Sequence, residues 1–424
     1  MGVLVSLAAF FTPEFMYRVY WRTPKYFDDT ALWISLACAV CFAAGAWLGT
    51  GRQSSRTNSN IGWDQNLPWD LLRTAFWFCF WASIAGYVAW AGVAAARGAN
   101  LALVLSVLRG ENGASYQMKE VYLVTVSGVT TLTQLGLVSM VVGVLIGVSK
   151  GWRLVRWPMA TLFALAAARA LFNSERLAII EMAIPVAVLF FKLAVLGSPR
   201  HNARRQLWLS LLPFAGAIAL ILVFAASEYF RSWSTFYSGS GMGFWEFVTL
   251  RLMGYYVTAL NNGALLMERI DTIGGPFFTL HFLWRFPLLN SLAHALYPAL
   301  TLDDVATDPY MRILEREANP EFNNGSGLLP PIIDYGFAGA LLFWLVAGLI
   351  CGLAYRSFQK NHIAGLLFYP ILFTGVAEVA RILYWGEGRV VTAYFILAPL
   401  AWVCTGVLRR RQMAQQGILW HPSH

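Results

Sequence analysis

The chain carries little charge for its length. Only 12% of its 424 residues are Asp, Glu, Lys or Arg, against about 25% in soluble domains. Its hydrophobic share is 58% and its mean hydropathy is +0.56. Several apolar runs reach about 20 residues, the length that a helix needs to cross the hydrocarbon core of a bilayer. These values exclude an ordinary soluble protein and predict an all-α, polytopic membrane protein.

Cysteine is scarce, and the common catalytic motifs are missing. The five cysteines all lie in apolar segments, which suits small buried hydrophobic residues better than zinc ligands. The chain has no Gly-rich loop ending in Gly-Lys-Ser/Thr, which argues against ATP-driven transport. It also lacks His-Glu-x-x-His and Gly-x-Ser-x-Gly. We therefore expect neither a metal nor any other cofactor.

Basic residues concentrate in short connections between apolar runs: Arg52 and Arg56; Lys150, Arg153 and Arg156; Arg200, Arg204 and Arg205; Arg356 and Lys360; and Arg409, Arg410 and Arg411. These connections alternate along the chain, so all of them can lie on one side of the membrane. The positive-inside rule makes that side cytoplasmic. Topology therefore explains the net charge of +9, and we expect no nucleic-acid partner.

Apolar length predicts ten spans, with both termini in the cytoplasm: residues 1–12, 31–49, 70–96, 121–149, 158–173, 176–196, 207–226, 335–355, 363–384 and 389–408. The first run has no basic leader and no clear cleavage site, so we interpret it as a short span rather than a signal peptide. The whole chain, 1–424, is predicted to be a single integral membrane domain without an appended soluble domain.

One long stretch, residues 227–334, is predicted to be a large extracytoplasmic loop. Long loops without a fold of their own are uncommon and usually functional. This one contains no lysine, several aromatic residues, and the arginines Arg231, Arg251, Arg269, Arg285, Arg312 and Arg316. Within it, 244–267 and 276–300 are fairly apolar but interrupted by charge or proline, which favours interfacial or re-entrant helices. Two additional spans would leave the remaining topology unchanged.

Arginine also recurs at the predicted outer ends of the spans: Arg169, Arg176, Arg231, Arg251, Arg381 and Arg389. A guanidinium group binds phosphate through two hydrogen bonds and stays charged at any working pH. Several fixed arginines at the outer surface therefore suit a diphosphate leaving group. The alternative for each one is structural, namely contact with lipid headgroups or an ion pair. Glu378 and Arg381, three residues apart on a helix, can form such a pair.

Four segments carry a resemblance to a known family: NSERLAIIE at 173–181, EYFR at 228–231, RLMGYYVTALNN at 251–262 and FNNGSGLLPPIIDYGFAG at 322–339. With the pattern of about ten spans and one large loop, the chain resembles bacterial oligosaccharide repeat-unit polymerases, the Wzy-like O-antigen polymerases. It is more distantly similar to the O-antigen ligases. The resemblance covers most of the chain from about residue 120.

The resemblance implies a GT-C-like fold and glycosyl transfer on the outer (periplasmic) face of the bacterial inner membrane. An acceptor hydroxyl on one lipid-linked repeat unit would attack the anomeric carbon of a growing glycan and expel undecaprenyl diphosphate. The product would be O-antigen, capsule or exopolysaccharide. Neither nucleotide nor metal is required for such a displacement. Expected partners are the undecaprenyl-diphosphate-linked oligosaccharide, membrane lipid, a flippase and a chain-length regulator.

The predicted catalytic residues are Glu228 as the base and Arg231, Arg176 and Arg251 around the diphosphate. The predicted substrate contacts are Arg169, Glu175, Tyr255, Tyr256, Asn261, Asn262, Arg285, Asn323, Asn324, Arg381 and Arg389. Glu175 is the second choice for the base. The asparagines are expected to bind sugar hydroxyls, although turn formation explains Asn-Gly pairs equally well.

Two other functions stay open. O-antigen ligases use a histidine in the large loop, and His281 and His294 are available here, but neither stands in a matching motif. A transporter or flippase of lipid-linked oligosaccharide would usually show an internal repeat and polar residues in mid-span. We find no repeat, and the charges stand mainly at span ends.

Overall fold

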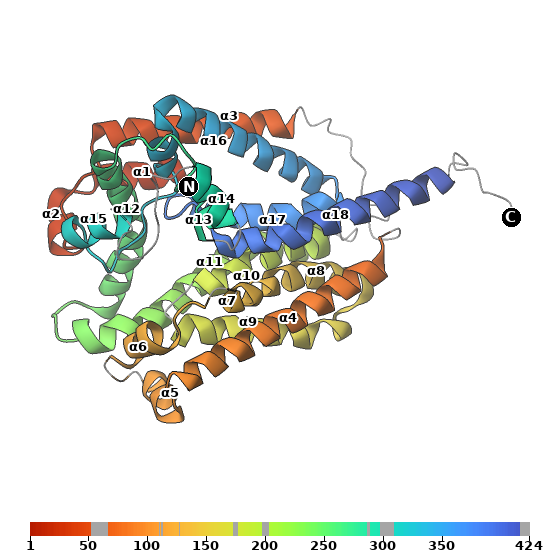
Figure 1. Ribbon diagram of the computed structural model, residues 1–424, viewed down its shortest axis with the longest axis horizontal. Helices are drawn as coiled ribbons and strands as arrows, with labels where there is room; N and C mark the ends of the chain where they lie inside the picture. The colour runs from red at the N-terminus through yellow and green to blue at the C-terminus, as the bar shows by residue number, and fades with distance from the viewer. Residues whose placement is uncertain are drawn as a thin grey trace. The chain divides into compact units, whose positions relative to one another are not determined.

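The computed structural model describes residues 1–51, 67–109, 111, 113–126, 128–172, 177–196, 203–285, 289–296 and 309–415. Over these ranges the chain is almost entirely helical, and no β-strand forms within them (Figure 1). Two compact units can be distinguished, and each is described separately. The first comprises Met1–Ser55, Thr249–Arg356 and Leu372–Val391; the second comprises Arg56–Val248, Ser357–Ile371 and Thr392–His424.

Six helices in the described ranges are long and apolar enough to cross a membrane: Asp29–Thr50 (α3), Trp69–Ala96 (α4), Val129–Lys150 (α7 and α8), Phe214–Ser234 (in α11 and η4), Pro330–Gln359 (α16) and Gly388–Arg411 (in α18). The predicted helical membrane protein is thereby confirmed, while the count of ten spans stays a prediction. The other four predicted spans coincide with α1 (Gly2–Phe11), α9 (Arg156–Phe172), α10 (Leu177–Phe190) and α17 (Ile363–Glu378). At about 1.5 Å per residue, α1 is about 15 Å long, half the thickness of the hydrocarbon core.

The elements not yet given with full bounds are short or lie in the predicted loop, except for α11 and α18, which contain two of the six apolar helices above. They are α2 (Glu14–Val19), α5 (Leu101–Leu108), α6 (Ala114–Gln117), η1 (Met118–Tyr122), η2 (Trp152–Leu154), η3 (Phe191–Leu196), α11 (Ala203–Glu228), η4 (Tyr229–Tyr237), α12 (Phe244–Arg269), α13 (Phe282–Arg285), α14 (Leu289–Leu296), α15 (Pro309–Glu317), η6 (Tyr384–Gly386) and α18 (Gly388–Gln415). Residues 227–334 are thus largely helical where they are described.

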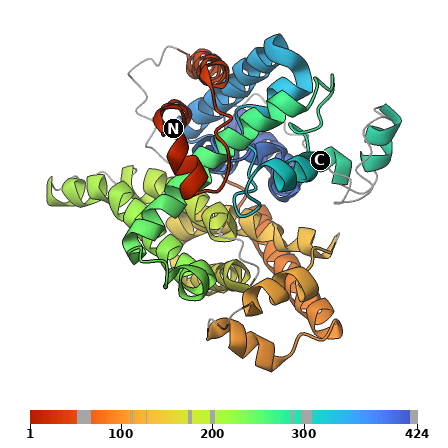
Figure 2. The ribbon, with the colours of Figure 1, turned by 90° about the vertical axis from the view of Figure 1, so that its left-hand side faces the viewer.

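In the first unit, α3 and α16 pack closely along two Gly-x-x-x-Gly sequences, Gly45 to Gly49 and Gly348 to Gly352. A Cβ atom on Gly45 would lie only 2.0 Å from the carbonyl oxygen of Leu345, so no larger residue fits there. Such small residues let membrane helices approach until their backbones touch. Gly45 meets Leu345, and Gly49, one turn later, meets Leu349. The two helices therefore run parallel, side by side (Figures 1 and 2).

The parallel arrangement brings the C-terminal ends of α3 and α16 together. A Cβ atom on Gly51, which follows α3, would lie 3.4 Å from Nη1 of Arg356 near the end of α16. Arg52 and Arg56 follow Gly51 in the sequence. One end of this helix pair thus carries Arg356, one of the basic residues that are predicted to be cytoplasmic, and the opposite end is formed by the N-termini of both helices.

Helix α12 is the central helix of the first unit, because every residue from 257 to 266 is buried. Whether this part is an interfacial or a re-entrant helix stays a prediction. Helix α12 is not one of the six apolar helices, since its interior includes the polar residues Thr258, Asn261 and Asn262. Thr258 donates to the carbonyl of Gly254 at 2.6 Å, and both asparagines bind distant backbone.

Two segments outside the α-helices cross inside the first unit: residues 318–329 before α16, and residues 379–387, which include the short η6, between α17 and α18. Ser326 pairs with Ile382 in an isolated parallel bridge. The amide of Gly327 donates to the carbonyl of Val379 at 2.9 Å. A Cβ atom on Gly327 would lie 2.5 Å from that same carbonyl oxygen, so glycine permits the crossing.

The crossing lies beside the N-terminal part of α16. This helix bends at Gly336, whose φ is 69° and ψ is 178°. The indole of Trp344 donates to the carbonyl of Leu328 at 3.1 Å. Trp344 stands eight positions after Gly336, which is about 12 Å along the helix axis. Non-helical backbone inside membrane proteins is tolerated where it is buried in protein or lines a cavity.

Helix α8 (Leu135–Lys150) holds the corresponding position in the second unit, beside α4 and α9, and its residues 135–147 are buried. Its packing depends on small residues. A Cβ atom on Gly143 would lie 2.8 Å from Sδ of Met159, and Ser139 donates to the carbonyl of Phe76 at 3.1 Å. On α4, Ser83 donates to the carbonyl of Thr133 at 3.1 Å. The second unit therefore contains a closely packed helical bundle.

Candidate functional site

The structure divides the predicted site residues between the two units. The first unit holds Arg251, Tyr255, Tyr256, Asn261, Asn262, Arg285, Asn323, Asn324, Arg381 and Arg389, and the second holds Arg169, Glu228 and Arg231. Glu175 and Arg176 lie outside the described residues, as do the side chains of Arg231 and Arg285. The geometry below therefore concerns the first unit.

Arg251 on α12 is almost fully buried and forms an ion pair with Glu321. The distance from Nη1 of Arg251 to Oε2 of Glu321 is 2.5 Å; the arginine side chain is 5% exposed and the glutamate 44%. A buried charge is stable only when it is paired. Removing the partner from a buried pair typically costs about 3–5 kcal/mol, because the remaining charge stays in a poor solvent.

Two aromatic rings enclose this guanidinium. Its central carbon lies 4.6 Å from the ring centre of Phe322 and 5.8 Å from that of Tyr255, which stands one turn further along α12. The two rings contact each other edge to face, with centroids 5.3 Å apart. Cation–π contacts of this kind stabilise a desolvated arginine. The site thus fixes Arg251 in one position before any ligand arrives.

The backbone around Glu321 is held by side chains from distant parts of the chain. Oδ1 of Asn319 accepts from the Glu321 amide at 3.0 Å, and its Nδ2 donates to the carbonyl of Trp21 at 2.9 Å. The indole of Trp21 donates to the carbonyl of Leu250 on α12 at 3.1 Å. Asn262 donates to the carbonyls of Phe322 at 2.6 Å and Asn324 at 3.0 Å.

Asn261 performs a similar task for the segment between α2 and α3. Its Oδ1 accepts from the amides of Tyr26 at 2.7 Å and Phe27 at 3.0 Å. Its Nδ2 donates to the carbonyl of Pro24 at 2.9 Å. Asn261 and Asn262 are fully buried, and each holds a different segment of backbone against α12. We therefore assign both a supporting role in place of the sugar contact expected from the sequence.

Glu378 and Arg381 form a second ion pair, as their spacing predicts. Nε of Arg381 lies 2.8 Å from Oε2 of Glu378, and the side chains are 15% and 4% exposed respectively. Tyr256 on α12 lies within electrostatic range of both charges. The pair stands beside the crossing, because the amides of Arg381 and Ile382 donate to the carbonyl of Glu378.

A buried aspartate holds a further segment against the bend of α16. Asp334 is fully buried and accepts from the amides of Phe278 at 3.0 Å and Thr279 at 2.7 Å. The hydroxyl of Thr279 donates to it at 2.7 Å and also lies 2.6 Å from the hydroxyl of Tyr335. Asp334 therefore ties residues 277–279 to the start of α16.

The remaining predicted residues are less closely joined. Asn323 is exposed, and its carbonyl accepts from the hydroxyl of Tyr310. Arg389 is half-buried at the start of α18. In the second unit, Arg169 donates to the hydroxyl of Thr133 at 3.2 Å and stacks over Trp90 at 5.3 Å. Glu228 is fully buried at the end of α11.

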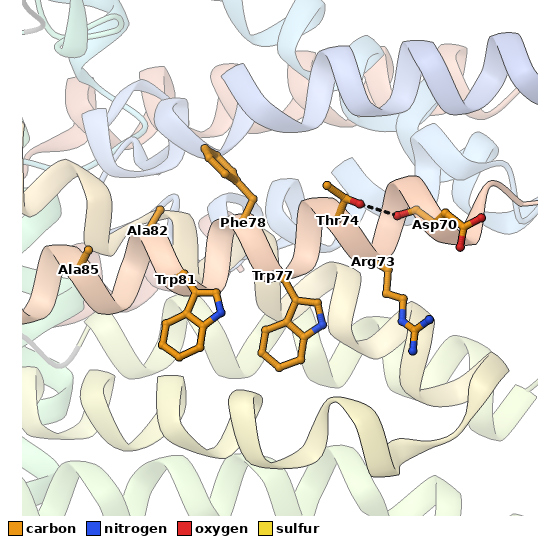
Figure 3. A pocket seen from close by; sticks show the side chains of 8 residues that line it. All are labelled: Asp70, Arg73, Thr74, Trp77, Phe78, Trp81, Ala82 and Ala85. Atoms are coloured by element: carbon orange, nitrogen blue, oxygen red, sulfur yellow. Dashed lines mark hydrogen bonds between the residues drawn. The ribbon is translucent and has the colours of Figure 1, made fainter.

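A groove of about 800 Å³ runs along one face of α4 in the second unit. Figure 3 shows the indoles of Trp77 and Trp81 extending from the same side of the helix, with Asp70 and Arg73 near one end. The groove is open and mostly apolar, which suits the lipid-facing surface of a spanning helix. None of the predicted site residues lines it.

Sequence reasoning missed Glu321, Asn319 and Trp21. Glu321 immediately precedes the Asn-rich segment that carries the family resemblance, and this position was the available signal. The described residues contain no group of three His, Cys, Asp or Glu side chains that could hold a metal ion. No protein-family model, curated protein or solved structure matches the chain.

Proposed function

We propose that the protein is a glycosyltransferase that polymerises undecaprenyl-diphosphate-linked oligosaccharide repeat units on the outer face of the bacterial inner membrane. The observation that supports this most is the pair of arginine–carboxylate ion pairs, Arg251–Glu321 and Arg381–Glu378, at a crossing of non-helical backbone in the first unit. Ionised groups inside a membrane domain are costly and usually functional.

The location of this site supports an extracytoplasmic reaction. Residues 318–329 lead into the N-terminus of α16, away from the end at which Arg356 approaches Gly51. If that basic end is cytoplasmic, as the positive-inside rule predicts, the site lies in the outer half of the membrane. The undecaprenyl chain of the substrate would anchor its diphosphate at this side of the membrane.

In the proposed reaction, a hydroxyl of the acceptor attacks the anomeric carbon of the donor glycan. The bond from that carbon to the diphosphate breaks, and undecaprenyl diphosphate leaves with the electron pair. Arg381 and Arg389 are the arginines of the first unit that we assign to the diphosphate. Glu228, as base, and Arg231 stay predictions from the sequence.

Purified protein with synthetic lipid-linked repeat units, without nucleotide or metal, is expected to yield a ladder of longer glycans. Arg381→Lys keeps the positive charge but loses the paired hydrogen bonds of a guanidinium, and should slow the ladder about a hundredfold, as removal of one transition-state donor does. Arg410→Lys, at an exposed position on α18, is the matched control and should leave it unchanged.

Translocation of the lipid-linked oligosaccharide is the second candidate function, because broken helices in mid-membrane are also typical of transporters. Movement of the substrate across a vesicle membrane without formation of a glycosidic bond would favour it and contradict the polymerase. Transfer of a glycan to a different lipid acceptor, without a ladder, would favour the ligase alternative.

A further inference from the structure

Glu321 and Asn323 expose a carboxylate and a carboxamide on either side of a buried ring. Phe322 between them is 3% exposed, whereas Asn323 is exposed and the Glu321 side chain is 44% exposed. Arg251, at 5%, lies behind Glu321. A ligand approaching this surface therefore meets the glutamate before it meets the arginine.

The ion pair determines which ligands suit this surface. Arg251 balances the charge of Glu321, so the pair has no net charge with which to concentrate cations. An anion such as a diphosphate would have to displace Glu321 before it could reach the guanidinium of Arg251, which is 5% exposed. A neutral hydroxyl can donate to the carboxylate, and hydrogen bonds to an ionised acceptor are about twice as strong as neutral ones. The carboxamide of Asn323 both donates and accepts.

The surface is also rigid enough to select a ligand by shape. Asn319 links the amide of Glu321 to Trp21, and Asn262 links the carbonyls on both sides of Asn323 to α12. Glu321 and Asn323 thus stand on backbone that four hydrogen bonds hold in place. Preorganisation of this kind lowers the entropy lost on binding.

We propose that Glu321 and Asn323 form a subsite for the sugar end of a neutral oligosaccharide. Arg251 then acts as a positioning residue that holds Glu321, in place of the diphosphate contact predicted from the sequence. The proposal rests on the proposed function, because it gives the glycan and the diphosphate of one substrate separate binding places in the first unit.

The test measures binding without catalysis. The full chain, purified in lipid nanodiscs, is applied to a printed array of neutral oligosaccharides, with inorganic pyrophosphate as the competitor. We expect a subset of glycans to bind and pyrophosphate to leave that binding unchanged. Glu321→Gln should weaken it about tenfold to a hundredfold, the size expected for one hydrogen bond to a charged acceptor.

A double variant distinguishes loss of glycan binding from loss of folding. Arg251→Gln with Glu321→Gln removes both charges of the pair together, so neither is left without the other, and it should bind glycans as weakly as Glu321→Gln. The matched control is Arg269→Gln with Glu317→Gln. That pair also joins α12 to the following segment, at 2.8 Å, with side chains 41% and 32% exposed, and its removal should leave glycan binding unchanged.

Three outcomes would overturn the proposal: no glycan bound by the wild-type protein, displacement of the glycan by pyrophosphate, or wild-type binding by the double variant. The ladder assay separates this failure from that of the proposed function. Glutamate-dependent glycan binding without a ladder contradicts the polymerase alone. A normal ladder from the double variant contradicts the sugar subsite alone.

Discussion

Two helices, α12 and α8, are each buried at the centre of a unit, yet they are built in different ways. Residues 135–147 of α8 are apolar apart from Ser139 and contain no charge. Residues 249–269 of α12 include Arg251, Asn261 and Asn262. Helix α8 packs against other helices, whereas α12 hydrogen-bonds the backbone of segments that are not helical.

The difference is the reason why we place the proposed site in the first unit. A bundle around an apolar helix satisfies its backbone within each helix and needs no polar support. Non-helical backbone needs partners from elsewhere, and α12 supplies them to two such segments. Burying polar side chains on α12 costs free energy, and the hydrogen bonds to the non-helical segments offset that cost. One of these segments carries Glu321 and Asn323.

The largest expected loss of stability comes from the ion pair of Arg251 on α12. The buried part of α8 has no charged residue. Glu321→Ala leaves Arg251 without this carboxylate and should lower the free energy of unfolding by about 3 kcal/mol, the lower end for a buried pair because Glu321 is half-exposed. Glu317→Ala, beside the half-exposed Arg269, should cost less than about 1 kcal/mol. Denaturant titration of both variants in detergent measures the difference; equal losses would contradict the account.

A smaller effect is expected from the buried polar residues. Asn262→Ala removes the donor to the carbonyls of Phe322 and Asn324 and should cost about 2 kcal/mol. Ser139→Ala on α8 should cost about 0.5 kcal/mol, since the helical carbonyl that it contacts keeps its own helix hydrogen bond. The same titration tests the pair. A larger loss for Ser139→Ala would reverse the comparison.

The smallest effect is expected from glycine. A Cβ atom on Gly263 would lie 2.9 Å from the carbonyl oxygen of Gly325, which is backbone, whereas one on Gly136 of α8 would meet side-chain ends, Oγ of Ser83 at 3.0 Å and Cε of Met182 at 3.1 Å. Gly263→Ala should therefore cost about 1–2 kcal/mol. Gly136→Ala should be nearly neutral, because the helix propensity of alanine, worth about 1 kcal/mol, offsets the contact. Thermal unfolding of the two variants, followed by circular dichroism, checks this order.

The spanning helices could be predicted from the sequence because apolar length alone determines them. The run predicted at 31–49 is α3 at Asp29–Thr50, and the run at 70–96 is α4 at Trp69–Ala96. The burial of α12 was harder to predict from the sequence, because Arg251, Asn261 and Asn262 lower its mean hydropathy. Its burial depends on partners far along the chain: Pro24 lies 237 positions from Asn261.

The candidate site could be predicted only in part. The arginines and the Asn-rich segment were visible in the sequence. The Glu378–Arg381 pair was also predicted, although Arg381 lies in the turn after Glu378, the last residue of α17, and not on the helix. The pairing of Arg251 with Glu321, 70 positions away, depends on how residues 318–329 fold back onto α12. No local pattern encodes that contact, so an arginine expected to bind phosphate is instead found paired with a carboxylate.

The central claim is that the substrate binds in the first unit, beside α12. The most direct measurement places a photoreactive amino acid at Tyr255 and, in a second variant, at Trp81, which is 60% exposed in the apolar groove of α4. Each variant is illuminated with a radiolabelled lipid-linked oligosaccharide. The account predicts covalent capture of the glycan at position 255 and none at position 81. Capture at position 81 without capture at position 255 would contradict it.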